Sequence, residues 1–572
     1  MISGAVSAPR TSDTFPNTAL VSTLWHLYST VFTCPRGSHE VLHNKNVMSH
    51  NIIIGGGHNG LVCACYLARA GKRVTILERR SVVGGAAVTE EFHPGFRNSA
   101  ASYTVSLLNP KIIRDLNLHE HGLQVKLRPQ SNFFPLSDSE SLSFHRNFAD
   151  TQAEIARFSE TDAAALPDFY AMLESVADIL REELLRTPPN VGGGLSDLIR
   201  AGSFGLRAKR LSMVQRRDAL DLFTKSAADV LDAWFENDHV KAAFAFDSIV
   251  GNYGAPSTPG SAYVLLHHVF GEVNGEKGAW GHAVGGMGAI TQAMLKEALR
   301  LGVEVRTDVE VEEVLVDNGR AVGVRLAGGE RLSADKVISN VGPKLLYTKL
   351  VDPQHLSEEF QRRVRGFKVG SGTFRMNVAL SELPDFTCRP GTQLQQHHQS
   401  GIVIGPTMGY LEQAYLDAKQ FGWSREPIVE VLIPSTVDDT LAPPGQHVAS
   451  LFCQQFAPQL PDGSSWDEHR EAAADTIIDT VTRYAPNFRD AVLARQIHSP
   501  LDLERKFGLM GGDIFHGALG LDQLWSNRPF MGYGDYRTPV AGLYICGSGT
   551  HPGGGVTGVP GHNAAREILK DR

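Results

Sequence analysis

Cysteine is scarce in this chain, and its six cysteines are too scattered to form a disulfide framework. The sequence contains no C-x-x-C pair. Cys63 and Cys65 are two residues apart on a predicted helix, so they do not share a face. We therefore expect no dithiol redox centre and a reducing compartment. The other four are Cys34, Cys388, Cys453 and Cys546.

An excess of positive charge is also lacking, because the formal net charge is −8. Nucleic-acid-binding proteins normally carry a basic balance, so we expect no nucleic-acid partner. Hydrophobic residues make up 42% of the chain and charged residues 20%, as in ordinary globular proteins. With 572 residues, the chain is longer than one core usually accommodates, which predicts more than one domain.

Residues 1–48 contain few charges and many Ser and Thr residues. Interleaved polar residues make residues 14–35 too polar for a membrane span. The composition favours a removable leader, and we predict targeting to the mitochondrial matrix. The alternatives are a disordered leader without a targeting role and a mature chain that begins near Met48.

A strand, a glycine-rich turn and a helix follow this leader. Three β-branched residues, 52–54, run into Gly55, Gly57 and Gly60, which fit the G-x-G-x-x-G pattern. The first glycine permits a tight turn, the second lets the backbone approach a pyrophosphate, and the third lets the helix pack close to the strand. The helix N-terminus then offers N–H groups to the phosphates.

A second predicted strand, residues 74–77, ends on Glu78. A carboxylate at this place accepts hydrogen bonds from a ribose and favours an unphosphorylated adenosine ribose, as in FAD or NAD. A glycine-rich turn alone can be merely structural. The strand, the helix and the acid together favour a dinucleotide site.

Glycine clusters recur along the rest of the chain. Gly84 and Gly85 form a pair soon after the first unit. Two further glycine-rich anchors lie far along the chain: residues 285–288 open a predicted helix, and residues 547–558 precede a C-terminal helix. A domain that binds only NAD has no reason to place a glycine pair at Gly84. We therefore favour a flavin over NAD alone.

The segments between these anchors mix helices and strands. Residues 303–340 read as a β-meander that follows a helix, and residues 155–180 show helical spacing of apolar residues. Residues 196–223 form a basic amphipathic segment, for which a solvated helix face is the commoner explanation; peripheral contact with a membrane surface is the alternative.

The anchors resemble, in order, the motifs of the flavin-containing amine oxidoreductase superfamily, specifically its phytoene-desaturase-like branch, over about residues 49–572. The resemblance implies an α/β fold: a discontinuous Rossmann-like FAD-binding domain with an inserted α+β substrate domain. We assign residues 49–145, 276–345 and 536–572 to the FAD-binding domain. Residues 146–275 and 346–535 form the substrate domain of helices and a sheet.

The resemblance also implies which residues bind FAD. The glycines of the first turn would hold the pyrophosphate, Glu78 the adenosine ribose, and Val311 the adenine. The C-terminal glycines would approach the ribityl chain and the isoalloxazine. The predicted cofactor-binding residues are Gly55, Gly57, His58, Asn59, Gly60, Glu78, Arg79, Gly84, Gly85, Ala86, Val311, Gly547, Gly554, Gly555 and Val556.

The chain departs from the family pattern in two ways. Ser548 stands where many flavoproteins carry Asp or Glu, a change that the phytoene-desaturase-like branch tolerates. Neither a covalent-flavin cysteine nor an aromatic cage is evident near the C-terminus, which argues against amine oxidation.

We predict an FAD-dependent oxidoreductase that removes hydride from a C–H bond of a small, apolar substrate. His551, beside the C-terminal glycines, is the candidate catalytic residue, and a structural role is its alternative. His516 and Trp280 are weaker candidates. No metal site is expected.

A second hypothesis belongs to another class of function. The chain would then be a flavin-bearing or flavin-free regulatory protein that binds a mitochondrial protein partner. The intact glycine motifs favour a retained cofactor, but they do not establish turnover.

Overall fold

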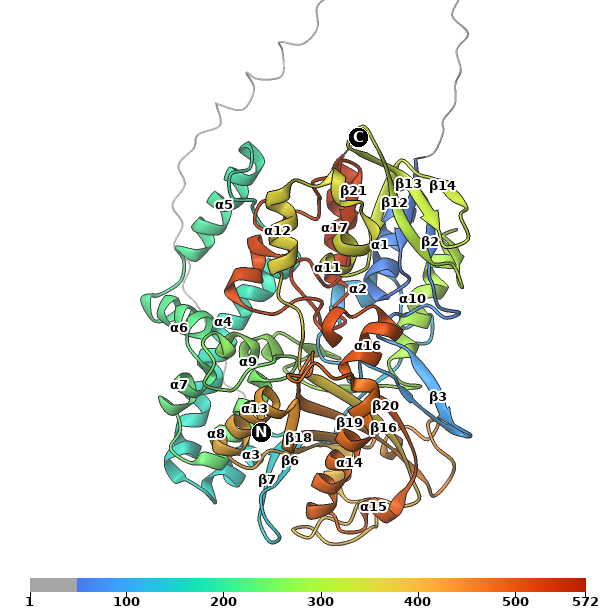
Figure 1. Cartoon of the computed structure of the whole chain (residues 1–572). Coiled ribbons are helices and arrows are strands. Elements are labelled where there is room, and N and C mark those ends of the chain that lie inside the picture. Colours follow the sequence, from blue (N-terminus) through green and yellow to red (C-terminus); the bar gives the residue numbers. More distant parts are fainter. Residues whose placement is uncertain (1–48, 572) are drawn as a thin grey trace, which may run out of the picture. The chain divides into compact units, whose positions relative to one another are not determined.

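The computed structural model describes residues 49–571, which belong to one compact unit (Figure 1). The predicted leader, residues 1–48, lies outside the described residues, and its targeting role stays a prediction. Within the described unit, strands from distant parts of the sequence assemble into two large sheets.

The first large sheet has five parallel strands in the order β11-β2-β1-β15-β21. Because all of its neighbouring pairs are parallel, the carboxyl ends of its strands meet at one edge. The strands are β1 (His50–Ile54), β2 (Arg73–Leu77), β11 (Glu304–Arg306), β15 (Lys336–Ser339) and β21 (Leu543–Ile545).

Both faces of the parallel sheet are covered. Ile53 packs toward three helices, whereas Ile52 and Ile54 pack toward a three-stranded antiparallel sheet, because side chains alternate along a strand. This explains why β1 is apolar throughout. The covering elements are α1 (His58–Arg69), α10 (Gly288–Arg300) and α17 (Val559–Lys570) on one face, and β12 (Val311–Asp317), β13 (Arg320–Leu326) and β14 (Arg331–Ser333) on the other.

The second large sheet has seven strands in the order β20-β16-β19-β18-β17-β6-β7, and only β17 and β6 pair in parallel. In Figure 1 it lies below the parallel sheet. The strands are β6 (Gln130–Pro135), β7 (Ser141–His145), β16 (Thr373–Leu380), β17 (Gly401–Ile404), β18 (Trp423–Leu432), β19 (His447–Phe456) and β20 (Val492–His498).

Helices pack on both faces of this second sheet. Leu451 and Cys453 of β19 face one helix, whereas Phe452 between them faces a group of helices on the other side. The single helix is α14 (Trp466–Tyr484). The group comprises α3 (Phe148–Ala156), α4 (Glu160–Leu184), α7 (Ala227–Asp232), α8 (Asp238–Ala245), α9 (Ser261–Val269) and α13 (Met408–Phe421).

Shorter elements connect these layers. The strands are β3 (Thr89–His93), β4 (Phe96–Ser99), β5 (Val125–Leu127), β8 (Glu272–Val273), β9 (Glu276–Lys277) and β10 (Gly281–Ala283). The helices are α2 (Pro110–Asp115), α5 (Leu195–Ala208), α6 (Met213–Thr224), α11 (Pro343–Leu345), α12 (Glu358–Gly366), α15 (Phe488–Ala491) and α16 (Pro500–Phe507).

The predicted α/β fold class with a second domain is confirmed, but the predicted meander over residues 303–340 is wrong in part. Only β12, β13 and β14 form an antiparallel meander. The flanking strands join the parallel sheet instead, where β11 pairs with β2 and β15 pairs with β1. Alternation of apolar residues predicts strands, but it does not specify their partners.

No described helix is long and apolar enough to span a bilayer. Within residues 49–571, no group of three or more His, Cys, Asp or Glu side chains is placed to hold a metal ion. The described cysteines are all free thiols. Burial raises the pKa of the Cys65 and Cys453 thiols, which makes them poor nucleophiles.

Buried histidines give the folded chain a predictable sensitivity to acid. Burial lowers the pKa of His267 and His397 to about 3, and that of His498 and His551 to about 4. Their pKa in the unfolded chain is about 6.5, so the unfolded state binds more protons between these values. Burial acts in the opposite direction on Asp247, whose pKa it raises to about 7, and on Asp513.

On unfolding, the four histidines take up more protons than the two carboxyl groups release. The free energy of unfolding should therefore fall as the pH drops from about 6.5 to about 4. Each net proton contributes a slope of about 1.4 kcal/mol per pH unit. Chemical unfolding at constant ionic strength measures this slope. A free energy of unfolding that stays level or rises on acidification would contradict the assignment.

Candidate FAD and substrate sites

Glycine shapes the turn between β1 and α1. Gly55 has a φ of +94°, a conformation that favours glycine. A Cβ atom on Gly60 would lie 2.5 Å from the carbonyl oxygen of Gly55, so α1 can approach the turn only if this residue is glycine. Gly60 therefore packs the helix against the strand and does not itself face the nearby cavity.

The N-terminus of α1 is open to an anion. Gly57 is its N-cap, no side chain caps the helix, and its first turn contains no acidic residue. The leading N–H groups and the positive end of the helix dipole are thus available to a phosphate. A Cβ atom on Gly57 would lie 2.8 Å from Nδ2 of Asn340 and would obstruct that approach.

Glu78 lies at the carboxyl end of β2, beside this turn. Its carboxylate accepts hydrogen bonds from the backbone N–H groups of Gly56, at 2.8 Å, and Arg80, at 3.0 Å. These two bonds fix the orientation of the carboxylate. Since a carboxylate has about four acceptor positions, it can still accept bonds from ribose hydroxyls.

The second glycine pair packs directly on the first turn. The N–H of Gly84 donates to the carbonyl of Gly56 at 2.9 Å, and a Cβ atom on Gly85 would lie 3.2 Å from Cα of Gly57. Both residues of the pair have positive φ, +132° and +58°. Gly85 and Ala86 line the cavity, whereas Gly84 lies behind them.

A cavity of about 410 Å³ opens over this edge of the parallel sheet, and we call it the dinucleotide cavity. Val311 joins it because the N–H of Val309 donates to the carbonyl of Glu78 at 2.9 Å. The predicted residues that line it are Gly55, Gly57, His58, Asn59, Glu78, Arg79, Gly85, Ala86 and Val311. Its lining residues outside the predicted cofactor-binding set include Arg80, Asn340, Lys349, Lys506, His516 and Ser548.

Two buried polar atoms at this cavity lack a protein partner among the described residues. They are Nε2 of His58 and Oδ1 of Asn59. Burial, reinforced by His516, lowers the pKa of His58 to about 3, so its ring is neutral. Buried polar atoms normally have hydrogen-bond partners, which indicates that a polar ligand completes this site. The cradle of glycines, the open helix N-terminus and these two atoms fit FAD.

A second cavity, of about 110 Å³, adjoins the first, and we call it the inner cavity. His58, Ala86, His516 and Ser548 line both cavities, so the two spaces share a wall. The inner cavity is largely apolar and aromatic. Its further lining residues include Tyr103, Thr104, Leu107, Val250, His268, Trp280, Phe452, Phe515, Gly555 and Val556.

The residues of the C-terminal glycine cluster lie at three different places. Gly555 and Val556 line the inner cavity, as expected of residues near a flavin. Gly547 instead packs on the carbonyl of Asn340, and Gly554 lines a separate hollow of about 150 Å³. Ser548 accepts a hydrogen bond from Nδ2 of Asn59 at 3.0 Å, which ties the last anchor to the first.

Two non-glycine residues at the inner cavity have left-handed backbone conformations. Val556 and His516 both have φ of +59°. A β-branched residue rarely adopts this conformation, and such strain concentrates at functional sites. Burial lowers the pKa of His516 to about 4, so its ring is neutral when it faces the cavities.

His551, the predicted catalytic residue, faces neither the dinucleotide cavity nor the inner cavity. Its ring is buried, and Nε2 lies 3.1 Å from the carbonyl oxygen of Glu183. Its own carbonyl accepts a hydrogen bond from the hydroxyl of Tyr536 at 2.9 Å. This arrangement favours the structural alternative for His551, whereas His516 and Trp280 do reach the inner cavity.

A buried polar cluster borders the inner cavity. The hydroxyl of Tyr103 donates to Oε2 of Glu430 at 2.6 Å, and Arg128 lies 3.9 Å from the other carboxylate oxygen. The guanidinium of Arg375 lies 4.6 Å from the centre of the Tyr103 ring. Burial and Glu430 together raise the pKa of the Tyr103 hydroxyl. Asp247 responds to burial and to Glu430, and its pKa rises to about 7.

Sequence reasoning missed this cluster. Tyr103 follows β4, and Arg128 directly follows β5. Arg375 lies on β16, Glu430 lies on β18, and Asp247 lies on the short 3-10 helix η1 (Phe246–Ser248), so no short motif links them. One signal was available: charged Glu430 and Arg375 each stand within a run that is mostly apolar. Charged residues at such positions are seldom buried unless they are paired.

Taken together, the parallel sheet with its glycine cradle and the adjoining inner cavity define an FAD-dependent oxidoreductase. Residues 60–373 match the model of the flavin containing amine oxidoreductase family, and the chain belongs to this family. The prediction of FAD as the cofactor is thereby confirmed.

The chain is similar to known proteins over most of its length. It is 42% identical to pyridine nucleotide-disulfide oxidoreductase domain-containing protein 2 of Rattus norvegicus, over 91% of this chain and 93% of the rat protein. It is 26% identical to the lycopene-forming phytoene desaturase of Pseudescherichia vulneris, over 90% and 97% of the two chains. An oxidoreductase structure from Methanosarcina mazei shares the fold, with a TM-score of 0.59 and 17% identity over 91% and 100%.

The glycine cradle makes a direct prediction. Gly57→Val should abolish FAD retention, because its side chain would fill the path to the α1 N-terminus and collide with Asn340. The visible flavin absorbance of the purified protein measures retention. The matched control is Gly328→Ala, at a glycine with open space around it and no positive φ. Full flavin content in the Gly57 variant would refute the proposed cradle.

Proposed function

We propose that this oxidoreductase removes a hydride from a C–H bond of an apolar substrate, as a dehydrogenase or desaturase. The wall shared by the two cavities carries the proposal, because the part of a substrate that enters the inner cavity would lie directly against a cofactor in the dinucleotide cavity. Leu107, Val250 and Phe452 contribute apolar surface to the substrate side. The similarity to a phytoene desaturase supports the same reaction type.

The residues of the inner cavity suggest how a proton leaves with the hydride. FAD, when bound, supplies the acceptor for the hydride and its two electrons. The adjacent carbon of the substrate loses a proton, which the hydroxyl of Tyr103 relays to Glu430, and a carbon–carbon double bond forms. The raised pKa of Tyr103 keeps its hydroxyl protonated, so it serves as a relay and the carboxylate is the base.

Arg128 compensates the buried negative charge of Glu430. The guanidinium lies 3.9 Å from the carboxylate and donates to the hydroxyl of Thr104 at 2.6 Å. It also lies 5.8 Å from the centre of the Trp280 ring. Burying a carboxylate without a partner costs free energy. Arg128 therefore stabilises the charge of Glu430 beside the inner cavity.

Two variants test the relay. Tyr103→Phe and Glu430→Gln should each slow anaerobic reduction of the bound flavin by about 10²-fold, the lower end for general acid–base catalysis, with FAD content unchanged. Stopped-flow absorbance with a panel of isoprenoid hydrocarbons, acyl thioesters and primary amines measures the rate. Tyr66→Phe is the matched control, since Tyr66 also donates to a carboxylate, Asp115, but lies away from both cavities.

The outcomes separate the enzyme from the regulatory alternative. Reduction by an apolar compound, slowed in both variants, supports the proposal. Unchanged rates in both variants would eliminate the relay. Stable FAD with no reduction by any compound would favour a flavin-bearing regulatory or interaction protein. His551→Ala should retain full reduction if this histidine is structural.

We further propose that the protein functions in the mitochondrial matrix, where it supports mitochondrial function and meets any protein partner. The composition of residues 1–48 supports this location. Mass spectrometry of the N-terminus of protein isolated from mitochondria tests it. Recovery of the intact N-terminus from the cytosolic fraction alone would rule out this location.

A further inference from the structure

The helix α5 is amphipathic, but it turns its apolar face outward. Arg200, Phe204 and Arg207 share one face of the helix at 3.6 residues per turn, and this face is half-buried. In a globular protein the apolar stripe of a helix normally faces the core. Here the exposed side chains are Leu195 (74%), Leu198 (67%), Ile199 (64%) and Leu206 (69%).

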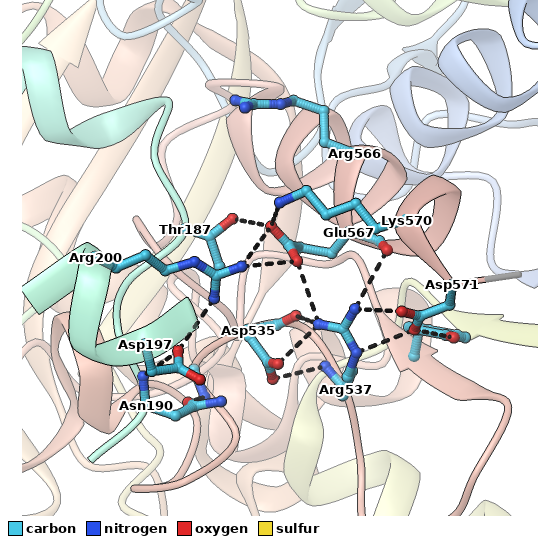
Figure 2. A network of polar contacts seen from close by, with 12 residues as sticks. Thr187, Asn190, Asp197, Arg200, Asp535, Arg537, Arg566, Glu567, Lys570 and Asp571 are labelled. Atoms are coloured by element: carbon cyan, nitrogen blue, oxygen red, sulfur yellow. Dashed lines mark hydrogen bonds and ion pairs between the residues drawn. The ribbon is translucent and has the colours of Figure 1, made fainter. Parts of the chain in front are cut away.

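Ion pairs fix this orientation. Nη2 of Arg200 lies 3.2 Å from Oε2 of Glu567, a buried residue of α17. Figure 2 shows Arg200 reaching from α5 to this carboxylate, which also contacts Arg537 and Lys570. Because its charged side is attached to the rest of the chain, α5 cannot bury its leucines by a simple rotation.

A second attachment lies two turns further along α5. Arg207 binds both oxygens of Glu183 on α4, at 2.6 and 2.9 Å. The ring of Phe204 lies 4.5 Å from that of Trp525. Two arginines and one aromatic ring thus fasten α5 along its length, and the leucine face remains without a cover within the described chain.

The following helix, α6, extends the same surface. Met213, Val214 and Leu220 are all more than half exposed. The turn before α6 and its first residues carry exposed cations, and among the described residues these cations pair with no acidic side chain. They are Lys209, Arg210, Arg216 and Arg217. Figure 1 draws α5 and α6 at the left edge of the described chain.

We propose that α5 and α6 dock this protein on the surface of a bilayer that contains anionic phospholipids. The leucine face of α5 enters the acyl-chain boundary, and the cations beside α6 contact the lipid phosphates. An amphipathic helix with apolar residues on one side and basic residues nearby is typical of interfacial binding. This surface does not depend on the substrate or on the proposed proton relay.

Charge complementarity favours a bilayer over a second copy of this chain. A symmetric dimer through α5 and α6 would bring the same four cations of each copy together, and like charges across an interface oppose association. An anionic lipid surface instead attracts them, with about a fivefold gain in partitioning for each basic residue.

Vesicle flotation of the full-length, FAD-loaded protein tests the proposal. We expect it to float with vesicles of phosphatidylcholine and phosphatidylglycerol, and much less with phosphatidylcholine alone. The variant L195S/L198S/L206S and the variant K209Q/R210Q/R216Q/R217Q should each float at least about tenfold less. The control is L299S/L416S, at two leucines that are 54% exposed on α10 and α13.

Flavin content and circular dichroism establish that each variant is folded. Flotation that is lost in both docking variants and kept in the control supports the proposal. Three results would overturn it: no flotation with the anionic vesicles, unchanged flotation of the leucine variant, or self-association of the wild type that the leucine variant abolishes. The last result would identify a second copy of the chain as the occupant.

Discussion

The parallel pairing of β1 with β2 on one side and β15 on the other is the constraint on which both cavities depend. Each strand ends at the same edge, so Gly55, Glu78 and Asn340 follow directly from three strands and meet there. Ser548 lies just after the end of β21 in the sequence. Distant pieces of sequence form one site because the sheet aligns their ends.

The nucleotide end of the site could be predicted because its chemistry is local. A glycine that must lie close to a phosphate, such as Gly57, belongs to a short sequence motif, and the acid at the end of the next strand belongs to the same unit. No such motif identifies the inner cavity. Tyr103 and Glu430 are 327 positions apart and meet only because the seven-stranded sheet places β18 beside the inner cavity. The surroundings of His551 could not be predicted for the same reason: Ser548 and Gly555, which are close to it in sequence, line the inner cavity, but its ring turns toward α4.

The basic segment 196–223 illustrates a different limit. Its composition predicted an amphipathic helix, and the structure contains α5 and α6 there. Composition alone could not tell which face points outward. The orientation of α5 depends on Glu183 of α4 and Glu567 of α17, which form ion pairs with the arginines of α5 and hold that face inward. Long-range ion pairs here outweigh the usual rule that apolar residues face the core.

The hydrogen bond between Asn59 and Ser548 has a consequence for how the protein is made. During synthesis from the N-terminus, β1, α1 and β2 emerge hundreds of residues before β21 and α17. Until those last elements leave the ribosome, β15 has an unpaired edge and α1 lacks its packing partner α17. From residue 339 to residue 543 the growing chain thus carries an exposed edge of β15 and uncovered apolar surface on α1, a state prone to aggregation.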